Sequence, residues 1–195
     1  MTPDQTPVHI QAILGSTRQG RFGSTVAEWF FQLASQREDM TVELIDLRDW
    51  PLPFFDSAKS PASSPDAVAP EAREWAEKIR QADGYVFITP EYNRGAPAVL
   101  KNALDYLWYE WNDKPLGLVG YGGAAGGARA LQQIRTVAME LEMAPVRSEV
   151  TMVFSRRLFD ENGNLKEESH AKSANQMLDQ VVRWAEAMRV LRSEG

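Results

Sequence analysis

The chain has 195 residues, of which 44% are hydrophobic and 25% are charged, a composition ordinary for one globular domain with one core. Its formal net charge of −6 disfavours a general nucleic-acid binder, which normally carries a basic patch. It has no cysteine for disulfides, thiolate catalysis or iron–sulfur clusters, and its two histidines, His9 and His170, are too few for a zinc site, so no metal is expected.

Residues 1–7 are polar, contain two prolines and are expected to form a flexible N-terminal segment. They lack the basic start and the apolar core of a signal peptide. No apolar run in the chain approaches the length of a membrane span. The sequence therefore predicts a cytoplasmic protein that does not bind a membrane.

Segments typical of strands and helices alternate along the chain. Apolar runs predict strands at residues 8–15, 41–47, 85–88, 116–120 and 150–154, and helical spacing predicts helices at 25–37, 68–82, 97–111, 128–143 and 167–191. The second strand alternates apolar and polar residues, which suits a sheet edge, whereas the third is continuously apolar, as in a strand buried on both faces. Residues 50–70, rich in proline, serine and aspartate, predict an irregular crossing.

Five strands that alternate with five helices predict an α/β fold, with a doubly wound parallel sheet and helices on both faces. No repeat or internal boundary is visible, so residues 1–195 are expected to form a single domain. In sheets of this kind, ligands bind beyond the carboxyl ends of the strands, where the strand order reverses. The loops after the first, third and fourth strands are therefore the candidate site.

The loop after the first strand, residues 15–24, has the composition of a phosphate site. Its glycines allow a tight turn with exposed N–H groups, its hydroxyl residues and two arginines add donors, and the following helix adds its positive end. Gly15 and Gly20 have the spacing of a nucleotide P-loop, but Arg21 and Phe22 replace its lysine and hydroxyl, so hydrolysis of ATP or GTP is not expected. An ordinary capped turn, with its arginines in solvent, is the alternative.

The other two loops suit a flat ring. Residues 89–97 have prolines at both ends and Gly95 between them, so the segment can aim consecutive N–H groups at the rim of a heterocycle, and Tyr92 offers a ring contact. Residues 121–127 are mostly glycine and alanine, which lets the backbone approach a ring closely. Ordinary strand-to-helix connections are again the alternative.

These segments resemble the NADPH-dependent FMN reductase family of flavodoxin-like proteins, which includes quinone, azo-dye and chromate reductases. The resemblance rests on Gly15-Ser16-Thr17-Arg18, on Pro90-Glu91-Tyr92-Asn93 and on Leu100-Lys101-Asn102-Ala103-Leu104-Asp105, and it extends from Val8 to about Leu191. It implies a flavodoxin-like five-stranded sheet of order 2-1-3-4-5 with FMN at its strand ends. It also implies NAD(P)H as the electron donor.

The resemblance further implies which residues bind FMN. The first loop would hold the flavin phosphate, the second would line the isoalloxazine ring, and the third would border the other edge of the ring. The implied residues are Ser16, Arg18, Arg21, Phe22, Gly23 and Ser24, then Pro90, Glu91, Tyr92 and Asn93, and finally Gly122 and Gly123. Many relatives have a serine where this chain has Arg21, so the sequence departs from the family pattern there.

The predicted function is an FMN-dependent NAD(P)H oxidoreductase that passes electrons to a small acceptor, such as a quinone, an azo dye, a metal oxyanion or free flavin. The flavin carries the hydride chemistry, so no catalytic side chain is predicted. Backbone N–H groups near Tyr92, Asn93 and Gly122 are expected to stabilise charge on the reduced ring. Glu91 is expected to act through its backbone, with its carboxylate at the rim or paired with a subunit neighbour.

The aromatic residues from Trp108 to Trp111, at the end of a predicted helix, predict a subunit contact in a homodimer or homotetramer. Three alternative functions remain. An electron carrier would hold FMN without nicotinamide turnover, and a flavin-free binding module would use the same phosphate loop. A phosphatase or NTPase is disfavoured because the chain lacks the cysteine, the P-loop lysine and the metal ligands that such enzymes use.

Overall fold

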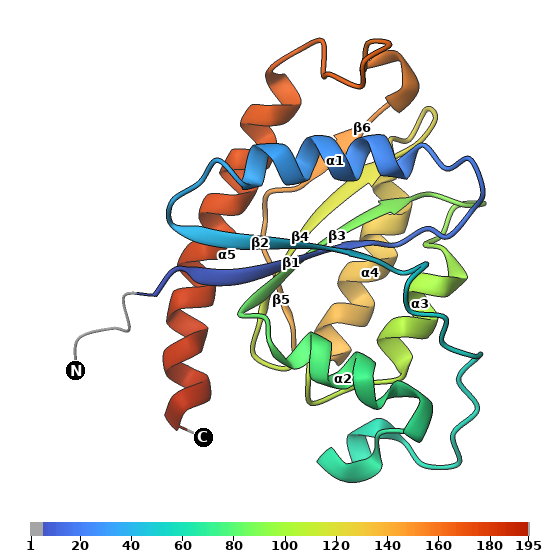
Figure 1. Cartoon of the computed structure of the whole chain (residues 1–195), viewed down its shortest axis with the longest axis vertical. Helices are drawn as coiled ribbons and strands as arrows, with labels where there is room; N and C mark the ends of the chain where they lie inside the picture. Colours follow the sequence, from blue (N-terminus) through green and yellow to red (C-terminus); the bar gives the residue numbers. More distant parts are fainter. Residues whose placement is uncertain (1–5, 195) are drawn as a thin grey trace.

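The computed structural model describes residues 6–194, so most of the predicted N-terminal segment 1–7 lies outside the described residues. The strands are β1 (Val8–Leu14), β2 (Met40–Asp46), β3 (Gly84–Pro90), β4 (Pro115–Tyr121), β5 (Ala144–Pro145) and β6 (Val150–Met152). The α-helices are α1 (Gly23–Ala34), α2 (Arg73–Arg80), α3 (Ala98–Asp105), α4 (Ala128–Glu140) and α5 (Ser169–Glu194). Strands and helices alternate in the predicted order (Figure 1).

The strands form one parallel sheet of order β2-β1-β3-β4-β5, which confirms the predicted flavodoxin-like order, with β2 at an edge. The fifth position is divided between two short strands. β5 pairs with the first residues of β4, and β6 pairs with its last three. The predicted strand 150–154 ends early, at Met152, because Phe154 has a left-handed φ of 48° that a strand does not accommodate.

Two layers of helices cover the sheet (Figure 1). Helices α2, α3 and α4 pack on one face, and α1 and α5 pack on the other. Successive side chains of β3 alternate between the layers: Phe87 packs in the α2–α4 layer, whereas Val86 and Ile88 pack against α1 and α5. Every residue of β3 is buried, as predicted for a strand covered on both faces.

The helix predicted over residues 97–111 is shorter, because α3 ends at Asp105 and the chain continues in turns. These turns bring Trp111 into the core, where it is fully buried and its ring packs against Trp75, Tyr85 and Phe87 at centroid distances of 6.2, 4.9 and 6.0 Å. Trp108 is half-buried. Trp111 therefore serves the core of its own subunit, whereas Tyr109 is 38% exposed, so the predicted subunit contact there stays a prediction.

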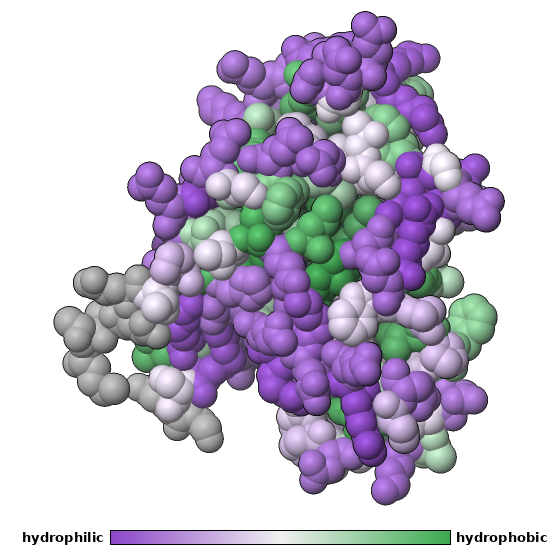
Figure 2. Space-filling model, viewed as in Figure 1, coloured by the Kyte–Doolittle hydropathy of each residue, from purple (hydrophilic) through white to green (hydrophobic). Residues whose placement is uncertain are grey.

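The surface of the molecule is largely hydrophilic in the view of Figure 2. Hydrophobic side chains show near the centre of this view, at the level where Figure 1 places the edge strand β2. Val42 and Leu44 of β2 are half-buried and pack against the α1–α5 layer. None of the helices within residues 6–194 is long and apolar enough to cross a membrane.

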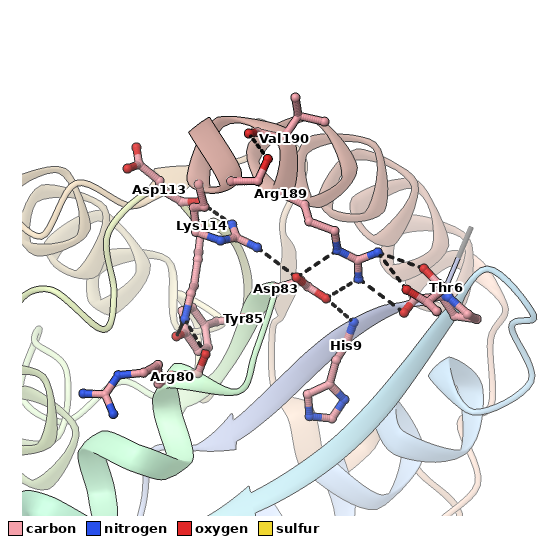
Figure 3. Close-up of polar contacts among 12 residues, drawn as sticks. Thr6, His9, Arg80, Asp83, Tyr85, Asp113, Lys114, Arg189 and Val190 are labelled. Atoms are coloured by element: carbon pink, nitrogen blue, oxygen red, sulfur yellow. Dashed lines mark hydrogen bonds and ion pairs between the residues drawn. The ribbon is translucent and has the colours of Figure 1, made fainter. Parts of the chain in front are cut away.

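A polar network ties helix α5 to the amino ends of the central strands (Figure 3). The carboxylate of Asp83 accepts hydrogen bonds from the backbone N–H of His9 at 2.9 Å, from Arg189 Nε at 3.1 Å and from Arg192 Nη2 at 2.8 Å. The network lies at the sheet edge opposite the candidate loops. It therefore fixes α5 without contributing to the candidate site.

A buried lysine lies at the same edge of the sheet. The ammonium of Lys114 donates to the hydroxyl of Tyr85 at 2.9 Å and to the carbonyl oxygen of Glu110 at 2.8 Å (Figure 3 labels both Lys114 and Tyr85). Burial, reinforced by the positive charge of Arg192, lowers the pKa of Lys114 from 10.5 to about 7. The folded protein therefore releases a proton that the unfolded chain keeps at pH values above about 7.

We expect the free energy of unfolding to increase as the pH rises from about 7 to about 9, by up to about 1.4 kcal/mol per pH unit, because the unfolded state binds the extra proton in this range. Denaturant unfolding at several pH values measures this slope. Lys114→Met should lose this slope, and Lys172→Met, at an exposed lysine, should keep it. A Lys114→Met protein with the wild-type slope would contradict the assignment.

Candidate functional site

The loops after β1, β3 and β4 meet at the carboxyl edge of the sheet, in the upper right of Figure 1. They surround an open cavity of about 450 Å³, within the range of roughly 300–1,000 Å³ that is usual for small-molecule sites. The predicted residues that line it are Arg18, Arg21, Phe22, Pro90, Glu91, Tyr92, Gly122 and Gly123. Asn93 lines an adjoining hollow, whereas the predicted residues Ser16, Gly23 and Ser24 do not line the cavity; Ser16 and Gly23 are buried and Ser24 is exposed.

The first loop presents a run of free backbone donors. The N–H of Gly15 donates to Ile88 O at 2.9 Å and anchors the loop to β3. The N–H groups of residues 16–20 donate to no acceptor within the described part of the chain. Helix α1 then begins at Gly23, two residues before the predicted start, with no side-chain cap. Free N–H groups beside the positive end of a helix form a site for an anion such as phosphate.

Arg21 has a partner that the sequence did not reveal. Its side chain is only 4% exposed, and its guanidinium forms a bidentate ion pair with Asp46 at the end of β2. The same guanidinium donates to the carbonyl oxygen of Ser16, and its Nε donates to Ser24 Oγ at 3.1 Å. Direct binding of phosphate by Arg21 and Ser24 stays a prediction, because both side chains already have partners within the chain.

The second loop contains a tight turn from Tyr92 to Gly95. The N–H of Tyr92 donates to Gly95 O at 2.9 Å, and the N–H of Gly95 donates to Tyr92 O at 3.0 Å. Asn93 and Arg94 complete the turn with left-handed φ values of 50° and 72°. The Tyr92 N–H is thus already bonded, whereas that of Asn93 has no acceptor within residues 6–194. A hydrogen bond of 2.8 Å between Tyr92 Oη and Ser16 Oγ links this loop to the first.

Glu91 forms an ion pair within its own chain. Its carboxylate accepts a hydrogen bond from Arg129 Nη1 at 2.7 Å and another from the backbone N–H of Arg129, at the start of α4, at 3.1 Å. Burial alone would raise the pKa of Glu91, but the contacts with Arg129 hold this pKa below its usual value. The contacts with Arg129 favour the ionised carboxylate, which fixes the loop to α4.

The third loop passes close to the end of β4 and presents little side chain. The N–H of Gly122 donates to Met152 O at 3.3 Å, so this donor, expected to face the ring, holds the loop to β6 instead. No atom lies within 4 Å of the position that a Cβ on Gly123 would occupy. A flat ligand can therefore approach the backbone of Gly123 closely.

One wall of the cavity was missed by the sequence analysis. It consists of residues 154–157, which follow β6, because only the loops after the first, third and fourth strands were considered. The guanidinium carbon of Arg156 lies 5.0 Å from the ring centre of Phe22, and that of Arg157 lies 4.9 Å from the ring centre of Phe154. No ion pair to either arginine exists among the described residues. In the sequence, the two consecutive arginines shortly after the predicted strand 150–154 were the signal that could have indicated this wall.

Tyr121, also missed, is a buried donor without a partner. Its hydroxyl is buried and forms no hydrogen bond within the described part of the chain. Gly23 makes room for it, because a Cβ at that position would overlap the hydroxyl oxygen. Burial raises the pKa of Tyr121, so the hydroxyl keeps its proton at neutral pH. Together with the free N–H groups and the unpaired arginines, this donor set fits a flat cofactor with a terminal phosphate.

Comparison with known proteins gives a consistent result. The model of the NADPH-dependent FMN reductase family matches residues 8–156. An NAD(P)H-dependent FMN reductase of Schizosaccharomyces pombe is 42% identical over 146 residues, which cover 73% of this chain and 72% of that protein. A 2-hydroxy-1,4-benzoquinone reductase of a Burkholderia species is 32% identical over 189 residues, which cover 93% of this chain and 98% of that protein.

Among solved structures, the flavoenzyme NAD(P)H:(acceptor) oxidoreductase of Paracoccus denitrificans is similar in fold. It superposes with a TM-score of 0.74 at 24% identity, over 93% of this chain and 98% of that one. The likeness therefore extends over nearly the whole of both chains and shows a shared fold.

Proposed function

Because the chain belongs to the NADPH-dependent FMN reductase family, we propose that it acts as an FMN-dependent oxidoreductase that passes electrons from NAD(P)H to a small acceptor. When bound, the flavin supplies the hydride chemistry, so the chain needs no nucleophile or general base. The observation that carries the proposal is the cavity at the carboxyl edge, with free N–H groups at one end and an open, glycine-bordered wall at the other. The residues of the chain bind the flavin, orient it and shield it from solvent.

The first loop is proposed to bind the flavin phosphate. Its free N–H groups and the positive end of α1 supply fixed partial charge, and the guanidinium of Arg18 lines the cavity with no ion pair within residues 6–194. Phe22 and Gly23 form the start of α1 behind this donor set. Ser16 holds Tyr92 by its hydroxyl, so we propose that it links the phosphate end of the site to the ring end.

The second and third loops are proposed to hold the ring. Pro90 and Glu91 form a rigid wall because β3 and Arg129 fix them, and the N–H of Asn93 remains available to a ring edge. Gly122 and Gly123 border the opposite side. Tyr92 and Phe154, exposed by 37% and 47%, stand at the mouth, where the nicotinamide and then the acceptor would enter.

A quinone is the acceptor class that we propose. The support is the benzoquinone reductase of the Burkholderia species, which is similar over nearly the whole of both chains. The open aromatic mouth of the cavity suits a planar acceptor better than a strongly hydrated one, since Tyr92 and Phe154 offer ring faces for stacking.

Assembly as a homodimer or homotetramer remains part of the proposal. With Trp111 in the core, the exposed aromatic rings left for a contact include Phe54 and Tyr109. Light scattering at micromolar concentration tests it, and a monomer would refute it. A cytoplasmic location is proposed from the sequence alone and is tested by cell fractionation.

The test of the function is a spectrum followed by turnover. Purified protein mixed with FMN should show the absorbance of bound oxidised flavin, and it should oxidise NADH or NADPH faster when a benzoquinone is added. FAD should bind more weakly than FMN, because the first loop closes over a terminal phosphate. Bound flavin without NAD(P)H oxidation would favour an electron carrier, and a protein that stays colourless would refute the proposal.

We expect Arg18→Ala to weaken FMN binding roughly tenfold or more, because a charge-assisted contact to phosphate contributes about 1.5–3 kcal/mol. The side chain is exposed, so the fold should survive. The measurement is an FMN titration followed by the NAD(P)H oxidation rate, which should recover with excess FMN. Unchanged FMN affinity would mean that Arg18 does not contact the phosphate.

A further inference from the structure

We propose that Asp46, Arg21 and Arg48 form a clamp that sets the direction of the peptide groups in the first loop, so that their N–H groups face the phosphate of the cofactor. The Asp46 clamp, defined by these three residues, consists of positioning residues that act through the loop. The inference rests on the proposed FMN site, but it concerns residues to which neither the sequence analysis nor that proposal gave this role.

Asp46 is the centre of the clamp. It ends β2 beside the first loop, and its carboxylate holds the guanidinium of Arg21 in a bidentate pair. Its Oδ1 also accepts the backbone N–H of Arg48 at 2.9 Å, which turns the chain after β2 and places the Arg48 side chain over the loop. One carboxylate thus fixes two arginines that come from different segments.

The two arginines hold three consecutive carbonyl groups of the loop. Arg21 Nη1 donates to the carbonyl oxygen of Ser16. Arg48 Nη2 donates to the carbonyl oxygen of Arg18 at 2.6 Å, and its Nε lies 3.4 Å from that of Thr17. The carbonyls of residues 16, 17 and 18 are therefore directed toward the clamp.

The orientation of the N–H groups follows from peptide geometry. In a trans peptide, the C=O of one residue and the N–H of the next point in opposite directions, and the described chain contains no cis peptide. Fixing the carbonyls of residues 16–18 therefore fixes the N–H groups of residues 17–19 on the side away from the clamp. These are among the loop donors that lack an acceptor in the described part of the chain.

The clamp accounts for the burial of the Arg21 side chain and gives the loop a preorganised set of donors. The guanidinium of Arg21 is almost fully covered because it is held between the Asp46 carboxylate, the Ser16 carbonyl oxygen and the Ser24 hydroxyl. A set of N–H groups that is already aligned needs no reorganisation when an oxyanion binds. The expected ligand chemistry is a phosphate monoester, so the clamp should affect FMN and leave riboflavin, which has no phosphate, almost unchanged.

The test compares the two flavins in direct binding. Flavin-free protein is titrated with FMN and with riboflavin, and binding is followed by quenching of flavin fluorescence, without turnover. Arg48→Ala is the main variant because its side chain is exposed and should not unfold the protein. We expect FMN affinity to fall roughly tenfold and riboflavin affinity to change less than about twofold. Arg48→Lys should restore part of the loss.

Asp46→Asn is the second variant, and Arg147→Ala is the matched control, since Arg147 is exposed and has no side-chain contact to the loop. Asp46→Asn should lower the affinity for FMN and leave the affinity for riboflavin almost unchanged. The ³¹P signal of FMN bound to this variant should also shift from its position in the wild-type complex. Wild-type FMN affinity in both clamp variants would overturn the inference, as would an equal loss for FMN and riboflavin. Failure of the wild-type protein to bind FMN would instead refute the proposed function.

Discussion

Replacing Trp111 with alanine should lower the free energy of unfolding by about 3–5 kcal/mol, the range found when a large buried aromatic is truncated. The indole is fully buried and packs against the rings of Trp75, Tyr85 and Phe87. Its N–H also donates to Leu104 O at 3.3 Å, a bond that the turn after α3 would lose. Denaturant unfolding followed by tryptophan fluorescence and circular dichroism measures the change.

Trp184→Ala is the matched control, because this indole is 41% exposed on α5 and its removal should change stability by about 0.5 kcal/mol. Trp111 does not line the cavity, so the folded variant should bind FMN with nearly the wild-type affinity. A small stability change together with a loss of oligomers would show instead that Trp111 serves a subunit contact, as the sequence had suggested.

Replacing Gly127 with alanine should destabilise the protein by about 2–5 kcal/mol, since a left-handed alanine costs about 1–2 kcal/mol and the steric overlap adds about 1–3 kcal/mol. Gly127 has a φ of 91°. A Cβ there would lie 2.6 Å from the backbone N of Tyr121 and 2.7 Å from the Cα of Gly120. These neighbours belong to strand β4, so no side-chain rotation relieves the overlap and the loop itself must move.

Because this loop borders the cavity, Gly127→Ala should also weaken FMN binding in any protein that still folds. Gly123→Ala is the control for stability, since a Cβ at Gly123 meets no atom within 4 Å. Thermal unfolding of both variants, with and without FMN, separates the two effects. Equal melting temperatures for the two variants would show that the close approach of Gly127 to β4 is absent in solution.

The sequence by itself determined the sheet and pointed to the sheet edge where the candidate site lies. Apolar runs of β3 and the alternation in β2 distinguish a central strand from an edge strand, because burial on two faces or on one dictates the pattern. Glycine-rich loops after three strands mark the carboxyl edge, since tight turns and close approach require residues without side chains. The resemblance carried by Pro90-Glu91-Tyr92-Asn93 then pointed to FMN, and the family match agrees.

Only the tertiary structure decided which side chains meet. Arg21 and Asp46 are separated by 25 residues, and nothing local in the sequence indicates that the end of β2 lies behind the first loop. Glu91 pairs with Arg129, and the guanidinium of Arg156 lies over the ring of Phe22, for the same reason. The parallel sheet brings strand ends that are distant in sequence to one edge. The sequence also did not determine where the helices end. Its helical pattern continues to residue 111, but α3 ends at Asp105, because the turns that follow bury Trp111 in the core.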